Sequence, residues 1–548
     1  MWVAIYFQKI FSETKKEITF AVPNGKRGTI AQLVEQRTEN PCVAGSIPAG
    51  TTKNLNQKWL GFCIFIAFQM KRALLFLVLC TLAKTMLAAV LLDSTAVRVA
   101  VNIPSLKLQK LYMGSYFGKF QTVVDSVILS DSGQGEFRAK KKYVSGIYFL
   151  ASERKELLTE FLMDSAQHFS IFLETPTSLP QISGSVENTY FSQYNAFLAK
   201  FAPEMSQLQA ELKQASPADS VKWNEAIATK LKSLDAYRAT FQQKHPKAVL
   251  SFLFQASKRP DAPSKASLKK PEDWYAYYQA HFWEGTSLAD PRLLRTPFFD
   301  QKLEEFLNYY VSPNPDELIK TIDELIKQAG DEQGECFRYL FSKLTDRYMR
   351  PQVMGQDKVF VHLFTEYYTK KDFAWLSAQQ KKYIFDRGYS LVSNQIGNPA
   401  PALQLSNLAG ERQNIYALKA PYTLLVFWDP NCSHCLQDVP QLDSLYRANW
   451  KKLGLKMVGI NIDEQAQTAW KAFIQKHHLE EWLHIYQPES EKLAEQKNQI
   501  PNYRQLYDVV QTPTLYLLDA NKKIVAKNLD AKGIDKFLGQ YLMSQKVK

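Results

Sequence analysis

The stretch LLVFWDPNCSHCLQDVP, residues 424–440, joins an apolar strand to a helix through two closely spaced cysteines. The strand delivers Cys432 to the first turn of the helix, where unpaired backbone N–H groups and the helix dipole stabilise a thiolate. Cys435 follows one helical turn later on the same face and is expected to be the more enclosed thiol. We therefore predict that Cys432 is a nucleophile and that Cys435 resolves a mixed disulfide formed on Cys432.

A Cys-x-x-Cys pair by itself also supplies two of the four ligands of a zinc site. The sequence contains no second pair of this kind, and neither His434 nor the His477-His478 pair has the spacing of a zinc knuckle. We therefore predict redox chemistry at Cys432 and Cys435, with no metal and no cofactor.

A second motif, Thr512-Pro513, lies about 80 residues downstream of Cys432 at the start of an apolar strand. A cysteine pair followed by such a threonine-proline step resembles the thioredoxin superfamily. The resemblance implies that the peptide bond before Pro513 is cis, that Pro513 faces the disulfide, and that the backbone of Thr512 pairs with a substrate peptide. We also assign Trp428, which ends the strand before the cysteines, to the substrate-binding surface.

The resemblance is strongest to the TlpA/ResA-like branch of the thioredoxins. It rests on the opening GNPAP at 397–401, on Phe427-Trp428, on Asp438 and Pro440 after the cysteines, and on the approach YDVVQTP at 507–513. It covers about residues 395–548 and implies a thiol-disulfide oxidoreductase. The branch includes reductases and isomerases, so the direction of exchange stays open.

Two residues beside the cysteines are expected to tune their chemistry. Cytosolic thioredoxins keep a buried aspartate where this sequence has Val426, so the proton of Cys435 must be handled elsewhere. Asp438 matches an acidic position of the TlpA/ResA-like branch and is expected to accept that proton, with a solvated helix carboxylate as the alternative. His434 precedes Cys435 as in the strongly oxidising DsbA-type motif. It is expected to favour the Cys432 thiolate and raise the reduction potential.

Three kinds of pattern divide the rest of the chain. Residues 89–175 contain short strands separated by turn signals, residues 185–393 have a helical apolar period, and residues 395–548 alternate strands with helices. The predicted fold class is multidomain, with a small β-sandwich or barrel, an all-α helical domain and a C-terminal α/β thioredoxin-like fold. This order resembles the multidomain envelope thioredoxins common in Bacteroidetes, whose two N-terminal domains have no assigned biochemical function. The ligand of these two domains therefore stays unknown.

An export signal is predicted at residues 70–88, where a basic start is followed by a short apolar run and small residues. The alternatives are a membrane anchor, which Lys71 and Arg72 interrupt, and a lipoprotein anchored through Cys80. Residues 31–48 resemble the peptide obtained when a transfer-RNA gene is translated, so we interpret residues 1–69 as non-native upstream translation. We expect an exported protein of the periplasm or cell envelope, with lipid anchoring left open.

The net charge of +13 does not indicate a nucleic-acid partner, because it falls to +6 over residues 89–548 and forms no dense Lys/Arg stripe. The expected partners are cysteine-containing envelope proteins as substrates and a membrane thiol electron donor. Two alternatives remain. One is an envelope binding or scaffold protein with an accessory thioredoxin domain. The other is a peroxidase of the peroxiredoxin type, which the intact cysteine pair disfavours.

Overall fold

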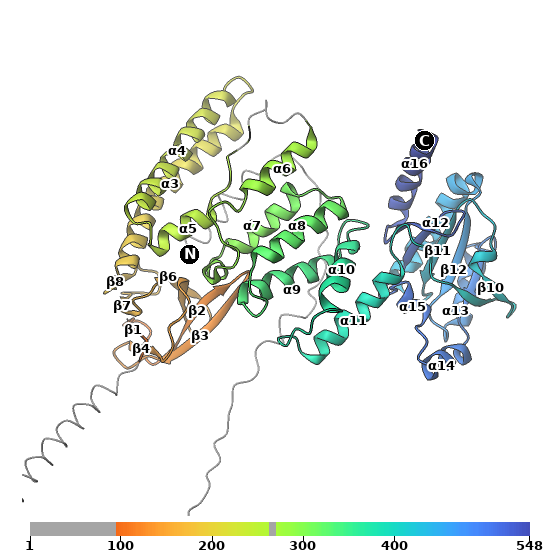
Figure 1. The fold of residues 1–548 in the computed structure, drawn as a ribbon, viewed down its shortest axis with the longest axis horizontal. Coiled ribbons are helices and arrows are strands. Elements are labelled where there is room, and N and C mark those ends of the chain that lie inside the picture. The colour runs from red at the N-terminus through yellow and green to blue at the C-terminus, as the bar shows by residue number, and fades with distance from the viewer. Residues whose placement is uncertain (1–94, 262, 264–269, 548) are drawn as a thin grey trace, which may run out of the picture. The chain divides into compact units, whose positions relative to one another are not determined.

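The computed structural model describes residues 95–261, 263 and 270–547 (Figure 1). The expected signal at 70–88 and the upstream residues 1–69 lie outside the described residues. Of the described residues, those from 95 to 250, without 117–119, form one compact unit, and residues 117–119 with those from 251 to 547 form a second. The predicted fold class is confirmed, because strands, then helices, then an α/β domain follow one another along the chain.

The N-terminal strands form two four-stranded sheets, ordered β4-β1-β7-β8 and β3-β2-β5-β6. Val97 and Val99 of β1 are buried and Arg98 between them is exposed, as expected for a sheet with one covered face. The valines share one core with Phe137 of their own sheet and Phe161 of the other, so the sheets pack as a small sandwich. The strands are β1 (Val97–Asn102), β2 (Lys110–Phe117), β3 (Phe120–Ile128), β4 (Gln134–Ala139), β5 (Gly146–Ala151), β6 (Leu157–Met163), β7 (His168–Phe172) and β8 (Gln181–Ser183).

Three helices follow the sandwich strands: α3 (Val186–Gln214), α4 (Ser220–Lys244) and α5 (Val249–Ser257). Ser185 caps α3, because its hydroxyl accepts a hydrogen bond from the backbone N–H of Asn188 at 3.2 Å. The Asn188 amide also donates to the carbonyl of Leu162 and accepts from its N–H, both at 2.8 Å. These bonds fix the start of α3 to strand β6.

Helix α8 (Pro315–Gln328) begins with a side-chain cap and a proline. Asn314 caps it by accepting from the N–H of Asp316 at 2.9 Å, and Pro315 occupies the first helical position. The elements of the helical middle of the chain are α6 (Pro271–His281), η2 (Pro291–Arg295), α7 (Phe299–Glu305), η3 (Phe306–Tyr310), α8 (Pro315–Gln328), α9 (Glu335–Met349), α10 (Asp357–Leu363), η4 (Phe364–Tyr368) and α11 (Ala378–Ser393).

The C-terminal domain is built on a seven-stranded sheet of order β10-β9-β13-β12-β11-β14-β15. Its strands are β9 (Gln404–Asn407), β10 (Arg412–Asn414), β11 (Thr423–Trp428), β12 (Lys456–Asn461), β13 (Leu483–Tyr486), β14 (Thr514–Leu518) and β15 (Ile524–Lys527). Its helices are η5 (Ile415–Ala417), α12 (Ser433–Leu445), η6 (Tyr446–Trp450), η7 (Lys451–Leu453), α13 (Gln467–Lys476), α14 (Glu489–Lys497), α15 (Tyr503–Leu506) and α16 (Ala531–Val547).

Strand β11 is the strand that leads to the cysteines, and both of its faces are covered. Leu424, Val426 and Trp428 face one core, whereas Leu425 and Phe427 face the other. Every residue of the strand is therefore buried. It runs parallel to β12 and antiparallel to β14. Over the described ranges, no helix combines the length and the hydropathy needed to span a membrane.

Candidate active site

Cys432 stands where strand β11 gives way to helix α12. It is the N-cap residue of α12, with an extended backbone (φ −82°, ψ 122°), and its carbonyl accepts the N–H of Leu436 at 3.0 Å. Its own N–H donates to the carbonyl of Asp429 at 3.1 Å, which closes the turn after the strand. The side chain is half-buried, so the sulfur lies at the helix N-terminus and remains within reach of solvent.

Cys435 lies in the first turn of α12 and is completely buried, with a relative exposure of 0 %. Both cysteines are free thiols in the structure. Burial raises the pKa of the Cys435 thiol to about 12. Cys435 is therefore protonated at neutral pH, and the two neighbouring thiols differ sharply in their readiness to ionise.

Opposing effects act on the sulfur of Cys432. Burial raises the pKa of the Cys432 thiol, while hydrogen bonds from the Thr512 side chain, from Cys435 and from the backbone N–H of His434 lower it. The hydrogen bonds prevail, so the pKa of Cys432 lies below that of an ordinary cysteine. The thiolate therefore forms more readily on Cys432 than on Cys435.

The Thr512–Pro513 step lies directly opposite the cysteines. Its peptide bond is cis, and the carbonyl oxygen of Thr512 is 3.5 Å from the sulfur of Cys432. The pairing of Phe427 with Thr514 between β11 and β14 brings this step to the end of the strand that carries the cysteines. The carbonyl oxygen of Thr512 can accept a hydrogen bond from Cys432 only while Cys432 is protonated. The side chain of Thr512 has the opposite effect, because its hydrogen bond favours the Cys432 thiolate.

The two predicted tuning residues occupy different environments. His434 has an exposed side chain, and it is the backbone N–H of His434 that lowers the pKa of Cys432. Asp438 lies one turn after Cys435 and is half-buried. The groups that lower the pKa of Cys435 are instead the backbone of Asp429 and the side chain of Thr512. The role of Asp438 as a proton acceptor therefore stays a prediction.

The assignment of Trp428 to the substrate-binding surface is wrong in this structure. Its side chain has a relative exposure of 0 % and packs on the ring of Phe473, with centroids 5.1 Å apart. The reason is the period of the strand, which places Trp428 on the same covered face as Val426. The uninterrupted apolar run Leu424–Trp428, typical of a strand covered on both faces, was the signal that could have excluded it.

Thr512 has a role that the sequence did not indicate, because its side chain lowers the pKa of both thiols.

The third described cysteine, Cys336, is buried in α9. Burial raises the pKa of Cys336 to about 12, which agrees with an unreactive structural thiol. Among the residues that the structure describes, no three His, Cys, Asp or Glu side chains converge as ligands for a metal ion.

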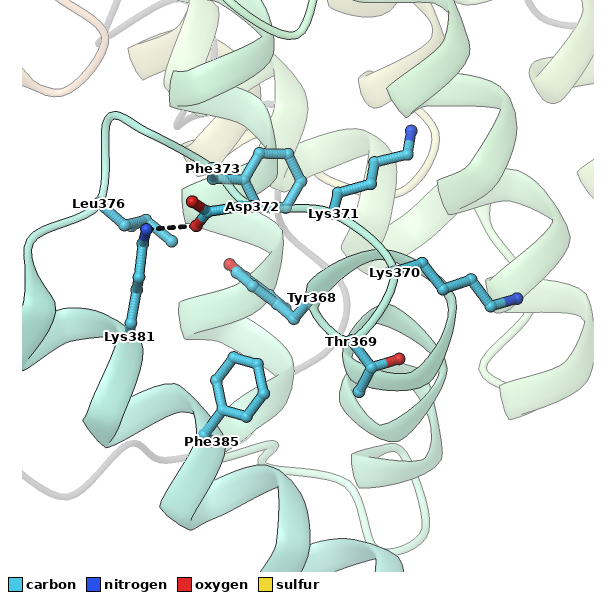
Figure 2. A pocket seen from close by; sticks show the side chains of 9 residues that line it. All are labelled: Tyr368, Thr369, Lys370, Lys371, Asp372, Phe373, Leu376, Lys381 and Phe385. Atoms are coloured by element: carbon cyan, nitrogen blue, oxygen red, sulfur yellow. Dashed lines mark hydrogen bonds and ion pairs between the residues drawn. The ribbon is translucent and has the colours of Figure 1, made fainter.

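Two pockets lie away from the cysteines. One, of about 320 Å³, is lined by the end of η4, the following loop and α11 (Figure 2). Its three lysines are all neutralised, since Lys370, Lys371 and Lys381 pair with Glu366, Glu332 and Asp372. The other, of about 580 Å³, is lined by residues of α14, α15 and the loop that joins them. Neither pocket is lined by a cysteine.

Comparison with known proteins matches two parts of the chain. Residues 421–524 match the family described as thioredoxin-like, and residues 220–393 match a domain family of unknown function. The chain is 27 % identical over 133 residues to the thiol-disulfide oxidoreductase ResA of Bacillus cereus, which covers 24 % of this chain and 69 % of that protein. The ResA of Geobacillus kaustophilus is 23 % identical over 162 residues, covering 28 % and 85 %.

Solved structures similar to this chain include a thioredoxin-like protein from Bacteroides caccae, at 22 % identity and a TM-score of 0.41, with 51 % of this chain and 97 % of that chain covered. A domain of a possible thiol-disulfide isomerase from Cytophaga hutchinsonii is 32 % identical, with a TM-score of 0.24 and coverages of 28 % and 97 %. The thioredoxin-like family match, residues 421–524, contains the two thiols and the cis-proline step. The C-terminal domain is therefore thioredoxin-like, and the chain is an oxidoreductase similar to the ResA thiol-disulfide oxidoreductases.

Proposed function

We propose that this chain is an exported thiol-disulfide oxidoreductase that exchanges disulfides with cysteine-containing proteins of the cell envelope. The Cys432 thiolate attacks one sulfur of a substrate disulfide, and the other substrate sulfur leaves as a thiolate. Cys435 then loses its proton and attacks the sulfur of Cys432, which releases the second substrate thiol and leaves a Cys432–Cys435 disulfide. Two electrons pass from the pair to the substrate, and a membrane thiol donor restores the reduced pair.

The observation that carries this proposal is the contrast between the two thiols. Cys432 is half-buried and its pKa is lowered, while Cys435 is fully buried and its pKa is raised to about 12. A reactive outer thiol beside a protonated inner thiol suits sequential attack and release, because the inner thiol cannot compete for the first substrate sulfur.

Substrate binding is assigned to the Thr512–Pro513 step. Strand β14 begins at Thr514, so the backbone of Thr512 lies before the ladder with β11 and is open to an incoming peptide. Its carbonyl is 3.5 Å from the Cys432 sulfur, which sets a bound peptide beside the thiol. We propose Asp438 as the acceptor of the Cys435 proton and His434 as a contributor to the thiolate through its backbone N–H.

Reduction of insulin disulfides by the full chain tests the catalytic proposal. We expect activity in the wild type, loss of turnover in Cys432→Ser, and a stalled mixed disulfide in Cys435→Ser. Retention of full activity in Cys432→Ser would refute the assignment of the nucleophile. If the wild type reduced no disulfide but still bound envelope proteins, the scaffold alternative would replace the catalytic one.

Export is proposed from the predicted signal at residues 70–88. It implies that the mature protein begins close to Ala89. Sequencing the N-terminus of protein from the native envelope fraction measures this, and a peptide from residues 1–69 in the mature protein would contradict it.

A further inference from the structure

A buried ion pair links the helical middle of the chain to the thioredoxin-like domain. Arg387 of α11 pairs with Asp508, and the two side chains are only 9 % and 8 % exposed. The Arg387 guanidinium also donates to the carbonyl of Met349 at 2.8 Å, so it is held from the side of the helical domain as well. A buried charge of this kind is costly unless its partner stays in place, so the pair constrains both partners.

Asp508 sits at the turn that ends helix α15. Its N–H donates to the carbonyl of Gln505 at 3.1 Å, and the N–H of Val509 donates to Arg504 at 2.8 Å. These are the two bonds of a Schellman helix end, with Asp508 in the left-handed position (φ 50°) that glycine usually occupies. Aspartate tolerates this conformation better than most residues, and here its carboxylate is used by Arg387.

The same turn is held at two further points. The Asn394 amide, at the C-cap of α11, donates to the carbonyl of Leu506 at 2.9 Å. The hydroxyl of Tyr516 in β14 donates to the carbonyl of Tyr507 at 2.5 Å. Three consecutive residues, 506–508, are therefore fixed by side chains from elsewhere, and two of the three anchors come from α11.

The segment 508–513 starts at this fixed turn and ends at the Thr512–Pro513 step. Only three residues separate Asp508 from Thr512, whose carbonyl lies 3.5 Å from the Cys432 sulfur. The segment is held from within, because the N–H of Val510 donates to the carbonyl of Asp508 at 2.9 Å and the hydroxyl of Thr514 donates to the carbonyl of Gln511 at 2.6 Å. Displacement of Asp508 is therefore passed on to Thr512.

We propose that Arg387 is a positioning residue for the thiol chemistry: by holding Asp508, it sets the place of Thr512 against Cys432. The helical domain thereby becomes part of the oxidoreductase site. The inference rests on the function proposed for Cys432, and it gives a role to a helix that lies within the family match of unknown function.

Alkylation of Cys432 in the reduced full chain tests the proposal. Iodoacetamide is applied across a pH series, and the modified Cys432 peptide is quantified by mass spectrometry. We expect Arg387→Met to shift the midpoint of the pH profile upward and to slow alkylation at pH 7 by about two- to thirtyfold, the range of such indirect couplings. Arg387→Lys keeps the charge and should recover part of the rate.

Arg259→Met is the matched control. Arg259 also holds a part-buried carboxylate, that of Glu305 at 2.7 Å, and a backbone carbonyl, that of Ser257 at 2.7 Å, but it lies in the helical region. We expect its alkylation profile to match the wild type. Equal profiles for Arg387→Met and wild type, or equal shifts in Arg387→Met and Arg259→Met, would overturn the proposal.

A substitute variant and a parallel activity assay complete the test. If Arg387→Met does not unfold cooperatively on heating, Asp508→Asn, which removes the other charge of the pair, is measured in its place, and an unchanged profile in that variant overturns the proposal. Insulin reduction by the wild type is measured in parallel. Its failure would refute the proposed function, whereas the alkylation profiles report on positioning alone.

Discussion

Replacing Thr512 by valine tests whether the side chain beside the two thiols sets their reactivity. Valine keeps the branched shape of threonine and removes only the hydroxyl that stabilises the Cys432 thiolate. Thr512→Val should therefore raise the pKa of Cys432 and reduce the thiolate population at neutral pH. The backbone carbonyl of Thr512, 3.5 Å from the sulfur, remains and adds to the preference for the protonated thiol.

The size of the effect follows from the one bond that is lost. A hydrogen bond to a charged group contributes about 1.5–3 kcal/mol. Cys432 is only half-buried, so water replaces part of the lost bond and we take about 1 kcal/mol. At pH values below the pKa, this amounts to about a fivefold loss of thiolate and a similar loss in the rate of alkylation.

The assay is the pH dependence of Cys432 alkylation in the reduced protein. Thr423→Val is the control, because it removes a buried hydroxyl from the far end of β11, where it accepts a bond from Lys522 at 3.0 Å. The control should lower thermal stability and leave the alkylation profile unchanged. A profile for Thr512→Val that coincides with the wild type would refute the assignment of the hydroxyl to the thiolate.

Two further predictions concern the same site. His434→Pro should raise the pKa of Cys432, because proline lacks the backbone N–H that stabilises the thiolate. His434→Ala keeps this N–H and should change the rate of Cys432 alkylation by less than about twofold. An effect of His434→Ala as large as that of His434→Pro would show that the imidazole acts directly. The rate at which Cys435 releases a mixed disulfide should rise with pH throughout the neutral range, because its pKa of about 12 leaves the thiolate scarce there. Stopped-flow release from a preformed Cys432 adduct measures this, and a rate independent of pH between 6 and 9 would contradict it.

The chemistry of the site could be predicted from the sequence because it depends on local features. An apolar strand, a cysteine at a helix start and a second cysteine one turn later define the two thiol environments without knowledge of the rest of the chain. The cap of α8 by Asn314 was predictable for the same reason, since the capping bond spans two residues.

The parts that the sequence did not reveal depend on contacts between distant residues. Arg387 and Asp508 are 121 positions apart. Asp508 belongs to the YDVVQTP approach, but Arg387 belongs to no motif, so the sequence did not indicate that the two side chains pair. The error at Trp428 has a different cause. Its position next to the cysteines suggested exposure, but a central strand is covered on both faces, and tertiary packing decided the outcome.

Trapping of substrates on Cys432 tests the central claim most directly. Full-length Cys435→Ala is expressed in the native host, and its adducts are separated under non-reducing conditions, with the double variant Cys432→Ser, Cys435→Ala as the control. The account predicts adducts with exported cysteine-containing proteins that disappear on reduction and are absent from the double variant. Adducts of equal abundance in the double variant, or no adduct in Cys435→Ala, would contradict the assignment of Cys432 as the nucleophile.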